Sequence, residues 1–72
     1  MAIRHLYPAS GGNRAEFYED GGEIYRMDNG EHVFYISDGI VYSYKSRKAV
    51  YWISGEYLYE YSSRKPKYYF TD

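Results

Sequence analysis

The chain has 72 residues, a formal net charge of −1 and no cysteine, but it has 12 tyrosines, three phenylalanines and one tryptophan. A chain of this length forms one small domain, and the lack of cysteine excludes both disulfides and thiolate zinc sites as support for its core. The aromatic side chains must therefore supply most of the core. The sequence has no run of the roughly 20 apolar residues that a membrane span needs, so we expect a cytoplasmic protein without membrane contact.

The first fifteen residues differ in composition from the rest of the chain. The stretch "IRHLY" at 3–7 has the composition of a strand, whereas "PASGGNRA" at 8–15 is typical of a loop. Residues 1–15 are therefore interpreted either as an N-terminal arm or as an extra strand. Residues 16–72 are predicted to form a β-hairpin repeat domain.

A repeat with a period of 17 residues runs through residues 16–72. It aligns the aromatic pairs Phe17-Tyr18, Phe34-Tyr35, Tyr51-Trp52 and Tyr68-Tyr69, and it aligns "SRK" at 46–48 with "SRK" at 63–65. A repeat of this length is normally one supersecondary unit that cannot bury its apolar side alone. The units must therefore pack on one another or on a partner.

Each repeat unit is predicted to be a β-hairpin. Runs rich in aromatic and β-branched residues favour strands at 16–20, 23–27, 32–37, 40–45, 49–54, 57–62 and 67–70. Tight turns are expected at Gly21-Gly22, Asp38-Gly39 and Gly55-Glu56. The predicted fold is an all-β antiparallel meander of about seven strands. It either curls into a small barrel or forms a single twisted sheet that stacks on a partner.

Both faces of this sheet are apolar if side chains alternate along each strand. The first face carries Tyr18, Tyr25, Met27, Val33, Tyr35, Ile40, Tyr42, Tyr44, Val50, Trp52, Tyr57, Tyr59, Tyr61 and Tyr69. The second carries Phe17, Ile24, Phe34, Ile36, Val41, Tyr51, Ile53, Leu58, Tyr68 and Phe70, together with Glu19, Arg26, Ser43 and Glu60. We expect the second face to form the core and the tyrosine-rich first face to meet a partner. The reverse assignment is the alternative.

The function favoured by this pattern is that of a small, non-enzymatic protein-interaction module. Its partner would be a second copy of the chain or another protein, bound through Tyr35, Tyr42, Tyr44, Trp52, Tyr57, Tyr59 and Tyr61. Two other interpretations of this face stay open: a purely structural ladder of stacked rings, and recognition of carbohydrate by Trp52 and its neighbours.

Charge is separated between the two ends of the predicted hairpins. The tight-turn end has the acidic residues Glu19, Asp20, Glu23, Asp38 and Glu56. The end with the longer loops has the basic residues Lys45, Arg47, Lys48, Arg64, Lys65 and Lys67. Basic loops beside aromatic rings are typical of proteins that bind single-stranded nucleic acid, so anion or nucleic-acid binding at these residues is the alternative function.

The sequence contains no pattern that is typical of an active site or of a bound cofactor. The two histidines, His5 and His32, do not have the spacing of a metal site or a hydrolytic triad. "MDNGEH" at 27–32 lacks the alternating oxygen ligands of a calcium loop. We therefore expect no catalytic, cofactor-binding or metal-binding residues.

Overall fold

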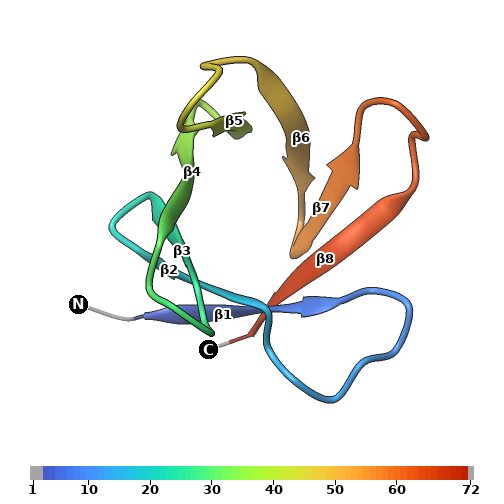
Figure 1. The fold of residues 1–72 in the computed structure, drawn as a ribbon. Helices are drawn as coiled ribbons and strands as arrows, with labels where there is room; N and C mark the ends of the chain where they lie inside the picture. The colour runs from blue at the N-terminus through green and yellow to red at the C-terminus, as the bar shows by residue number, and fades with distance from the viewer. Residues whose placement is uncertain (1–2, 72) are drawn as a thin grey trace.

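The computed structural model describes residues 3–71, which form eight strands and no helix. The strands are β1 (Arg4–Pro8), β2 (Phe17–Asp20), β3 (Glu23–Arg26), β4 (His32–Ser37), β5 (Ile40–Ser43), β6 (Ala49–Ser54), β7 (Tyr57–Glu60) and β8 (Pro66–Thr71). Each strand pairs antiparallel with the next, and β8 returns to pair with β1, so the sheet closes into a barrel (Figure 1). The predicted all-β antiparallel meander is confirmed, in its barrel form. Residues 3–71 have no helix long and apolar enough to span a membrane.

The first strand closes the barrel. Residues 3–7 were predicted to be either part of an arm or an extra strand, and the structure places Arg4–Pro8 as a strand between β2 and β8. Leu6 lies opposite Phe17 on one side and opposite Phe70 on the other. Because β1 pairs on both sides, neither end of the meander leaves an unpaired strand edge.

The tight turns adopt the backbone conformations that their glycines allow. Gly21 and Gly22 have φ angles of 62° and 90°, and Asp38 and Gly39 have φ angles of 53° and 76°. Two successive positive φ angles are the mark of the type I′ hairpin turn, whose twist matches that of the flanking strands. These turns set the register in which aromatic residues of paired strands lie opposite each other.

The longer loops repeat the same conformation once per unit. Gly30, Arg47 and Arg64 have φ angles of 72°, 62° and 59°. Each donates its backbone N–H to the carbonyl four residues earlier, at 2.9, 2.8 and 2.7 Å. A left-handed conformation costs a non-glycine residue about 1 kcal/mol or more. Because this conformation is unfavourable for arginine, the hairpins on either side of each loop must impose it on Arg47 and Arg64.

A β-bulge interrupts the pairing between consecutive hairpins. The register shifts after Ile24 in the β3–β4 pair and after Val41 in the β5–β6 pair, which leaves Val33 and Val50 without a directly paired residue. The sequence analysis placed both valines on the tyrosine-rich face, and this assignment was wrong, because both pack against the core. The assignment assumed strict alternation, and a bulge breaks this alternation by adding one residue to a strand.

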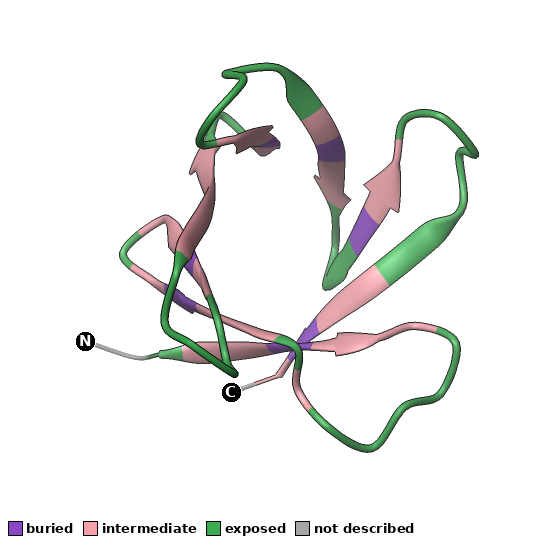
Figure 2. Ribbon diagram, viewed as in Figure 1, coloured by how far each residue is buried: buried purple, intermediate pink, exposed green. Residues whose placement is uncertain are grey.

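The barrel interior is filled by the second face, as predicted. Its centre is a layer of four aliphatic side chains, one from each odd-numbered strand, that are at most 1% exposed: Leu6, Ile24, Val41 and Leu58. Figure 2 shows buried residues only within the strands, whereas the loops are mostly exposed. On the tight-turn side of this layer, the even strands contribute Glu19, Ile36, Ile53 and Phe70.

On the other side of the aliphatic layer, four aromatic residues form a closed ring. Each ring packs edge-to-face on its neighbours, with centroid distances of 5.6 Å for Phe17–Phe34, 5.6 Å for Phe34–Tyr51, 5.9 Å for Tyr51–Tyr68 and 5.3 Å for Tyr68–Phe17. Edge-to-face packing is the favoured geometry of aromatic pairs. These residues occupy one position of the 17-residue repeat, so the repeat itself builds this layer.

Candidate functional site

The outer surface of the barrel is lined by stacked aromatic pairs. In three successive hairpins the rings of Tyr18–Tyr25, Tyr35–Tyr42 and Trp52–Tyr59 lie 5.2, 5.3 and 5.3 Å apart, with interplanar angles of 19°, 14° and 14°. The paired residues face each other across the strands that each tight turn connects. These cross-strand pairs stabilise the hairpins.

Beyond these pairs, one side of the barrel carries a continuous run of six aromatic rings. We call this surface the aromatic wall; it extends over β6, β7, β8 and β1 and consists of Tyr61, Trp52, Tyr59, Tyr57, Tyr69 and Tyr7. Consecutive centroids along the run are 5.0, 5.3, 6.4, 6.1 and 5.8 Å apart. Tyr57 and Tyr61 are 44% and 43% exposed, so the run is open to contact with another molecule.

The structure divides the predicted aromatic face into two groups. Four of the predicted residues belong to the aromatic wall: Trp52, Tyr57, Tyr59 and Tyr61. The wall also contains Tyr7 and Tyr69, which the sequence analysis did not select as site residues. Tyr69 could have been found, because it repeats the position of Trp52. Tyr7 lies outside the repeat and reaches the wall only because β1 pairs with β8.

The remaining predicted aromatic residues form a second group: Tyr35 and Tyr44 lie beside Arg47, and Tyr42 stacks on Tyr35. The Arg47 guanidinium lies 5.6 Å from the Tyr35 ring centroid and 5.3 Å from that of Tyr44. Tyr44 also packs on His32 at 4.0 Å, and the His32 Nε2 lies 2.6 Å from Glu23 Oε1. Arg47, His32 and Glu23 thus all contact neighbours within the chain, which suits a structural role.

The predicted basic residues lie in two segments of the chain, and these segments have different neighbours. Lys45, Arg47 and Lys48 follow β5, and Arg47 covers aromatic rings as described. Arg64 and Lys65 precede β8, and Lys67 is the extra residue of its bulge. Lys65 and Lys67 line a cavity of about 450 Å³ together with the carboxylates Glu16 and Glu60. A phosphate group in this cavity would therefore meet negative as well as positive charge.

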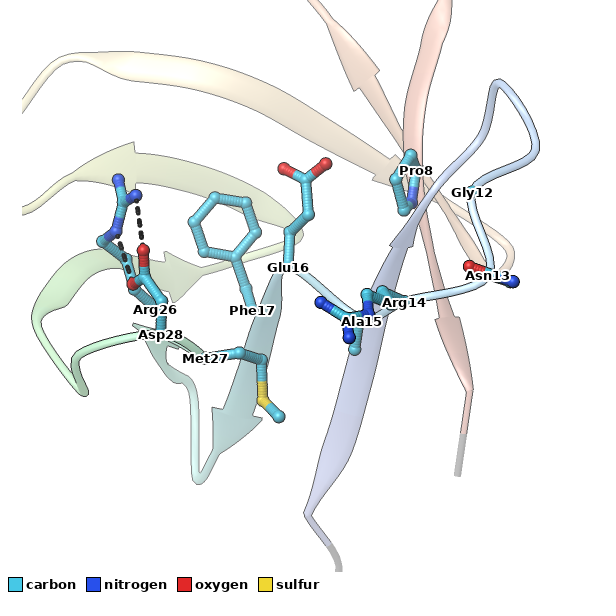
Figure 3. Close-up of a pocket in the computed structure, with 10 residues that line it drawn as sticks. All are labelled: Pro8, Gly12, Asn13, Arg14, Ala15, Glu16, Phe17, Arg26, Met27 and Asp28. Carbon is cyan, nitrogen blue, oxygen red and sulfur yellow. Dashed lines mark hydrogen bonds and ion pairs between the residues drawn. The ribbon is translucent and has the colours of Figure 1, made fainter.

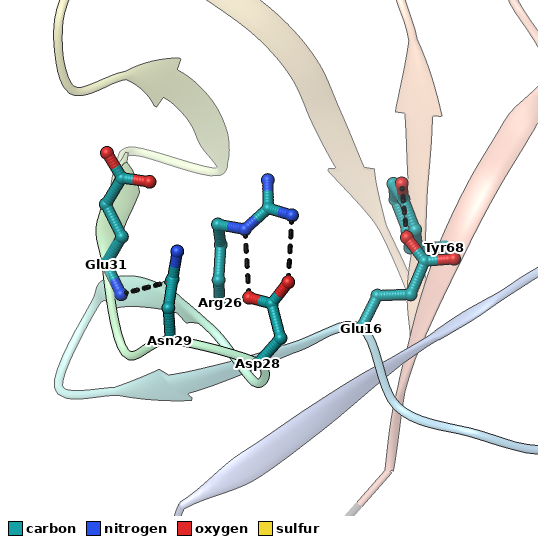
Figure 4. A network of polar contacts seen from close by, with 6 residues as sticks. All are labelled: Glu16, Arg26, Asp28, Asn29, Glu31 and Tyr68. Atoms are coloured by element: carbon teal, nitrogen blue, oxygen red, sulfur yellow. Dashed lines mark hydrogen bonds and ion pairs between the residues drawn. The ribbon is translucent and has the colours of Figure 1, made fainter.

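This cavity lies at the end of the barrel where the longer loops meet. We call its polar centre the barrel mouth, formed by Glu16, Glu60 and Tyr68; the ring of Tyr51 packs against that of Tyr68. The Tyr68 hydroxyl donates a hydrogen bond to Glu16 Oε1 at 3.2 Å (Figure 4), and the Ser63 hydroxyl donates one to Glu60 Oε1 at 2.9 Å. Sequence reasoning missed this site because its glutamates, 44 residues apart, meet only in the closed barrel.

A second cavity of about 490 Å³ lies beside the β1–β2 loop. Figure 3 shows Glu16 and Phe17 between this loop and the ion pair of Arg26 with Asp28. Both ion-pair contacts measure 3.1 to 3.2 Å, and the hydrogen bond from Arg26 lowers the pKa of Asp28. The charges of Arg26 and Asp28 on this side of the cavity therefore neutralise each other.

Burial raises the pKa of Tyr51 and of Tyr68, and neighbouring groups raise it further: Glu60 and Glu16 act on Tyr51, and Tyr51 and Glu16 act on Tyr68. The unfolded chain loses these protons near about pH 10, while the folded chain keeps them to higher pH. The stability that they contribute is therefore complete below about pH 10 and is lost as the pH rises above it. We expect urea unfolding between about pH 9 and 11 to show this loss.

The Tyr68→Phe variant should lose less stability over this pH range than the unchanged chain, because one of the two titrating hydroxyls is gone. Tyr57→Phe is the matched control, since Tyr57 is exposed on the outer surface. Equal pH dependence for Tyr68→Phe and Tyr57→Phe would contradict the prediction.

Among residues 3–71, no group of three or more histidine, aspartate or glutamate side chains is placed to hold a metal ion. The wall offers contact with aromatic rings, and the mouth offers hydrogen bonding and negative charge. In comparisons with known proteins, no family model, no curated protein and no solved structure matches this chain.

Proposed function

We propose that the protein is a non-enzymatic interaction module that self-associates through its aromatic wall. The observation that carries the proposal is the uninterrupted run of six rings on the outside of a barrel whose core is already filled. Stacked pairs alone would stabilise the hairpins. Tyr57 and Tyr61, however, leave more than two fifths of their surface in water, and tyrosine and tryptophan are enriched where proteins bind each other.

A second copy of the chain is the partner that the charge distribution favours. Glu56 lies at the tight-turn end of the wall, whereas Lys65 and Lys67 lie at the opposite end. A two-fold axis that lies in the plane of the interface, perpendicular to the strands, stacks two walls face to face and antiparallel, so that the acidic end of each faces the basic end of the other. Such self-complementary interfaces are the usual basis of homodimers.

The size of the wall is also adequate for a dimer. A standard interface buries about 800 Å² on each partner. The accessible surface of the chain is 4864 Å², so an interface of this size needs about one sixth of it. The wall extends over four of the eight strands of the closed barrel, and hence over about half of its circumference.

The test is the molar mass in solution as a function of concentration, measured by light scattering after size-exclusion chromatography. We expect the unchanged chain to have a dimer mass within about 5 to 200 µM. Tyr57→Lys and Tyr61→Lys should each weaken the dimer by about tenfold or more, because each places a charge in an apolar contact.

Tyr44→Lys is the matched control, since Tyr44 is equally exposed, at 42%, but belongs to the group around Arg47. It should leave the dimer intact. A monomer at all concentrations would contradict the proposal, as would equal dissociation by Tyr44→Lys and Tyr57→Lys.

A further inference from the structure

Three loops at one end of the barrel share a backbone conformation but differ in charge. The β3–β4 loop (27–31) has the acidic residues Asp28 and Glu31, whereas the β5–β6 loop (44–48) and the β7–β8 loop (61–65) have no acidic residue. All three form the same backbone hydrogen bond between residues four apart, so the loop conformation does not require a basic side chain. The last two loops nevertheless hold five cations: Lys45, Arg47, Lys48, Arg64 and Lys65.

Three of these cations have no side-chain partner within residues 3–71. Lys45, Lys48 and Arg64 are exposed, and their side chains form no hydrogen bond, ion pair or cation–π contact in this part of the chain. Arg64 also has a φ angle of 59°, a left-handed conformation that the equivalent Gly30 adopts without steric cost. Neither the backbone nor a contact of its side chain within residues 3–71 accounts for an arginine at this position.

The β5–β6 and β7–β8 loops lie beside each other at the same end of the barrel (Figure 1). The backbone N–H of Tyr61, at the start of the β7–β8 loop, donates to the carbonyl of Val50 at 3.2 Å. Val50 follows Lys48, the end of the β5–β6 loop, by two residues. Equivalent positions of the two loops are two strand spacings apart, which is about 10 Å. We call residues 44–48 and 61–65 together the basic loop pair.

Each loop of the basic loop pair begins with an exposed tyrosine. Tyr44 and Tyr61 are 42% and 43% exposed. Tyr61 packs on Trp52 at a centroid distance of 5.0 Å and has no other aromatic neighbour within residues 3–71, so its ring is open to a further stacking partner. Tyr44 is partly covered by Arg47, whose planar guanidinium can itself stack on an aromatic base.

We propose that the basic loop pair binds single-stranded nucleic acid. Cationic side chains that follow the phosphates, together with rings that stack on unpaired bases, are the means by which proteins hold a single strand. A strand of about four to eight nucleotides would extend over both loops. The proposal does not depend on Lys65, whose cavity also contains the carboxylates of Glu16 and Glu60.

The test is the fluorescence anisotropy of a labelled oligo(dT) of about ten nucleotides, titrated with the full chain at about 50 mM salt. We expect a dissociation constant of about 1 to 100 µM. With about three to four phosphate contacts, binding should weaken roughly 20-fold to 50-fold between 50 and 200 mM salt. Absence of binding at 50 mM salt, or binding that does not respond to salt, overturns the proposal.

An abasic strand of the same length tests the contribution of the bases. It carries the same phosphates but has nothing to stack on Tyr61, so it should bind at least about fivefold more weakly than oligo(dT). Equal affinity for the two strands would identify a site for polyanions in general and would overturn the proposal.

Charge-reversal variants distinguish the basic loop pair from general attraction to positive charge. Lys48→Glu and Arg64→Glu should each weaken binding by about fivefold or more at about 100 mM salt. Arg14→Glu is the matched control and should change binding less than about twofold. Arg14 is likewise exposed and has no ion pair within residues 3–71, but it lines a cavity with Asp28 of the acidic loop. Equal weakening by Arg14→Glu and Arg64→Glu overturns the proposal.

Tyr61 also belongs to the aromatic wall, so strand binding must be separated from self-association. Tyr61→Leu should weaken binding of oligo(dT) by about fivefold or more, whereas Tyr57→Leu, a change of the wall residue at the tight-turn end, should alter it less than about twofold. Equal losses overturn the proposal, because binding would then follow the wall and not the ring beside the cations. All substituted side chains are exposed, and circular dichroism checks that each variant is folded. A monomeric chain that binds the strand would contradict only the dimer.

Discussion

Replacing Leu58 by alanine is expected to lower the free energy of unfolding by about 3 kcal/mol. Leu58 is 1% exposed and belongs to the aliphatic layer at the centre of the barrel. The removed atoms lose their burial, and closed strands around the site limit its collapse, so a cavity is left behind. A domain of this size has only a few kcal/mol of stability, so the variant should be largely unfolded at 37 °C.

Urea unfolding followed by circular dichroism measures this effect. Tyr57→Ala is the matched control, because it changes the preceding residue of the same strand, whose side chain is exposed on the outer surface. It should cost less than about 1 kcal/mol. A smaller loss for Leu58→Ala than for Tyr57→Ala would contradict the interior that we describe.

Replacing Glu19 by alanine is expected to cost about 2 kcal/mol. Glu19 is 7% exposed and is the one acidic residue in a layer otherwise made of Ile36, Ile53 and Phe70. Its carboxylate accepts hydrogen bonds from Arg4 at 2.7 Å and from the backbone N–H of Gly22 at 2.9 Å. Alanine removes both bonds and leaves a void.

Glu19→Ile tests whether the carboxylate itself is needed. Isoleucine is the residue that two other repeat units have at this position, and apolar replacements of buried ion pairs are often neutral or stabilising. The Arg4 side chain is 38% exposed and can turn to water. We expect this variant to lie within about 1 kcal/mol of the unchanged chain in thermal and urea unfolding. A loss as large as that of Glu19→Ala would show that the hydrogen bonds, and not the packing, dominate.

The repeat accounts for most of the fold that could be predicted. Because its period is constant, it aligns the aromatic pairs and the glycine turns of all units, and hence it predicts the strands and the side of the sheet that carries Ile24 and Leu58. Barrel closure could not be predicted from it, because closure depends on β1. That strand has no place in the repeat, and its partners are at both ends of the chain.

The bulges and the polar end of the barrel were beyond sequence reasoning for a common reason. Both depend on how strands of different hairpins meet. Val33 changes face only because its neighbours His32 and Phe34 both find partners on β3. Glu16 and Glu60 are ordinary charged residues in the sequence and become one site through closure. The residues of the aromatic wall that belong to the repeat could be predicted from the sequence, whereas Tyr7 could not.

The fourfold aromatic layer also determines what the barrel can hold. The seven strands of the repeat and β1 together give eight strands, and at this circumference side chains just fill the interior. Phe17, Phe34, Tyr51 and Tyr68 touch around a closed circle and leave no lumen. A chain with one more hairpin of the same design would have a wider circumference, on which five such rings could not all meet at the axis. Gain of a single hairpin would thus open a cavity along the axis of a barrel that is now filled.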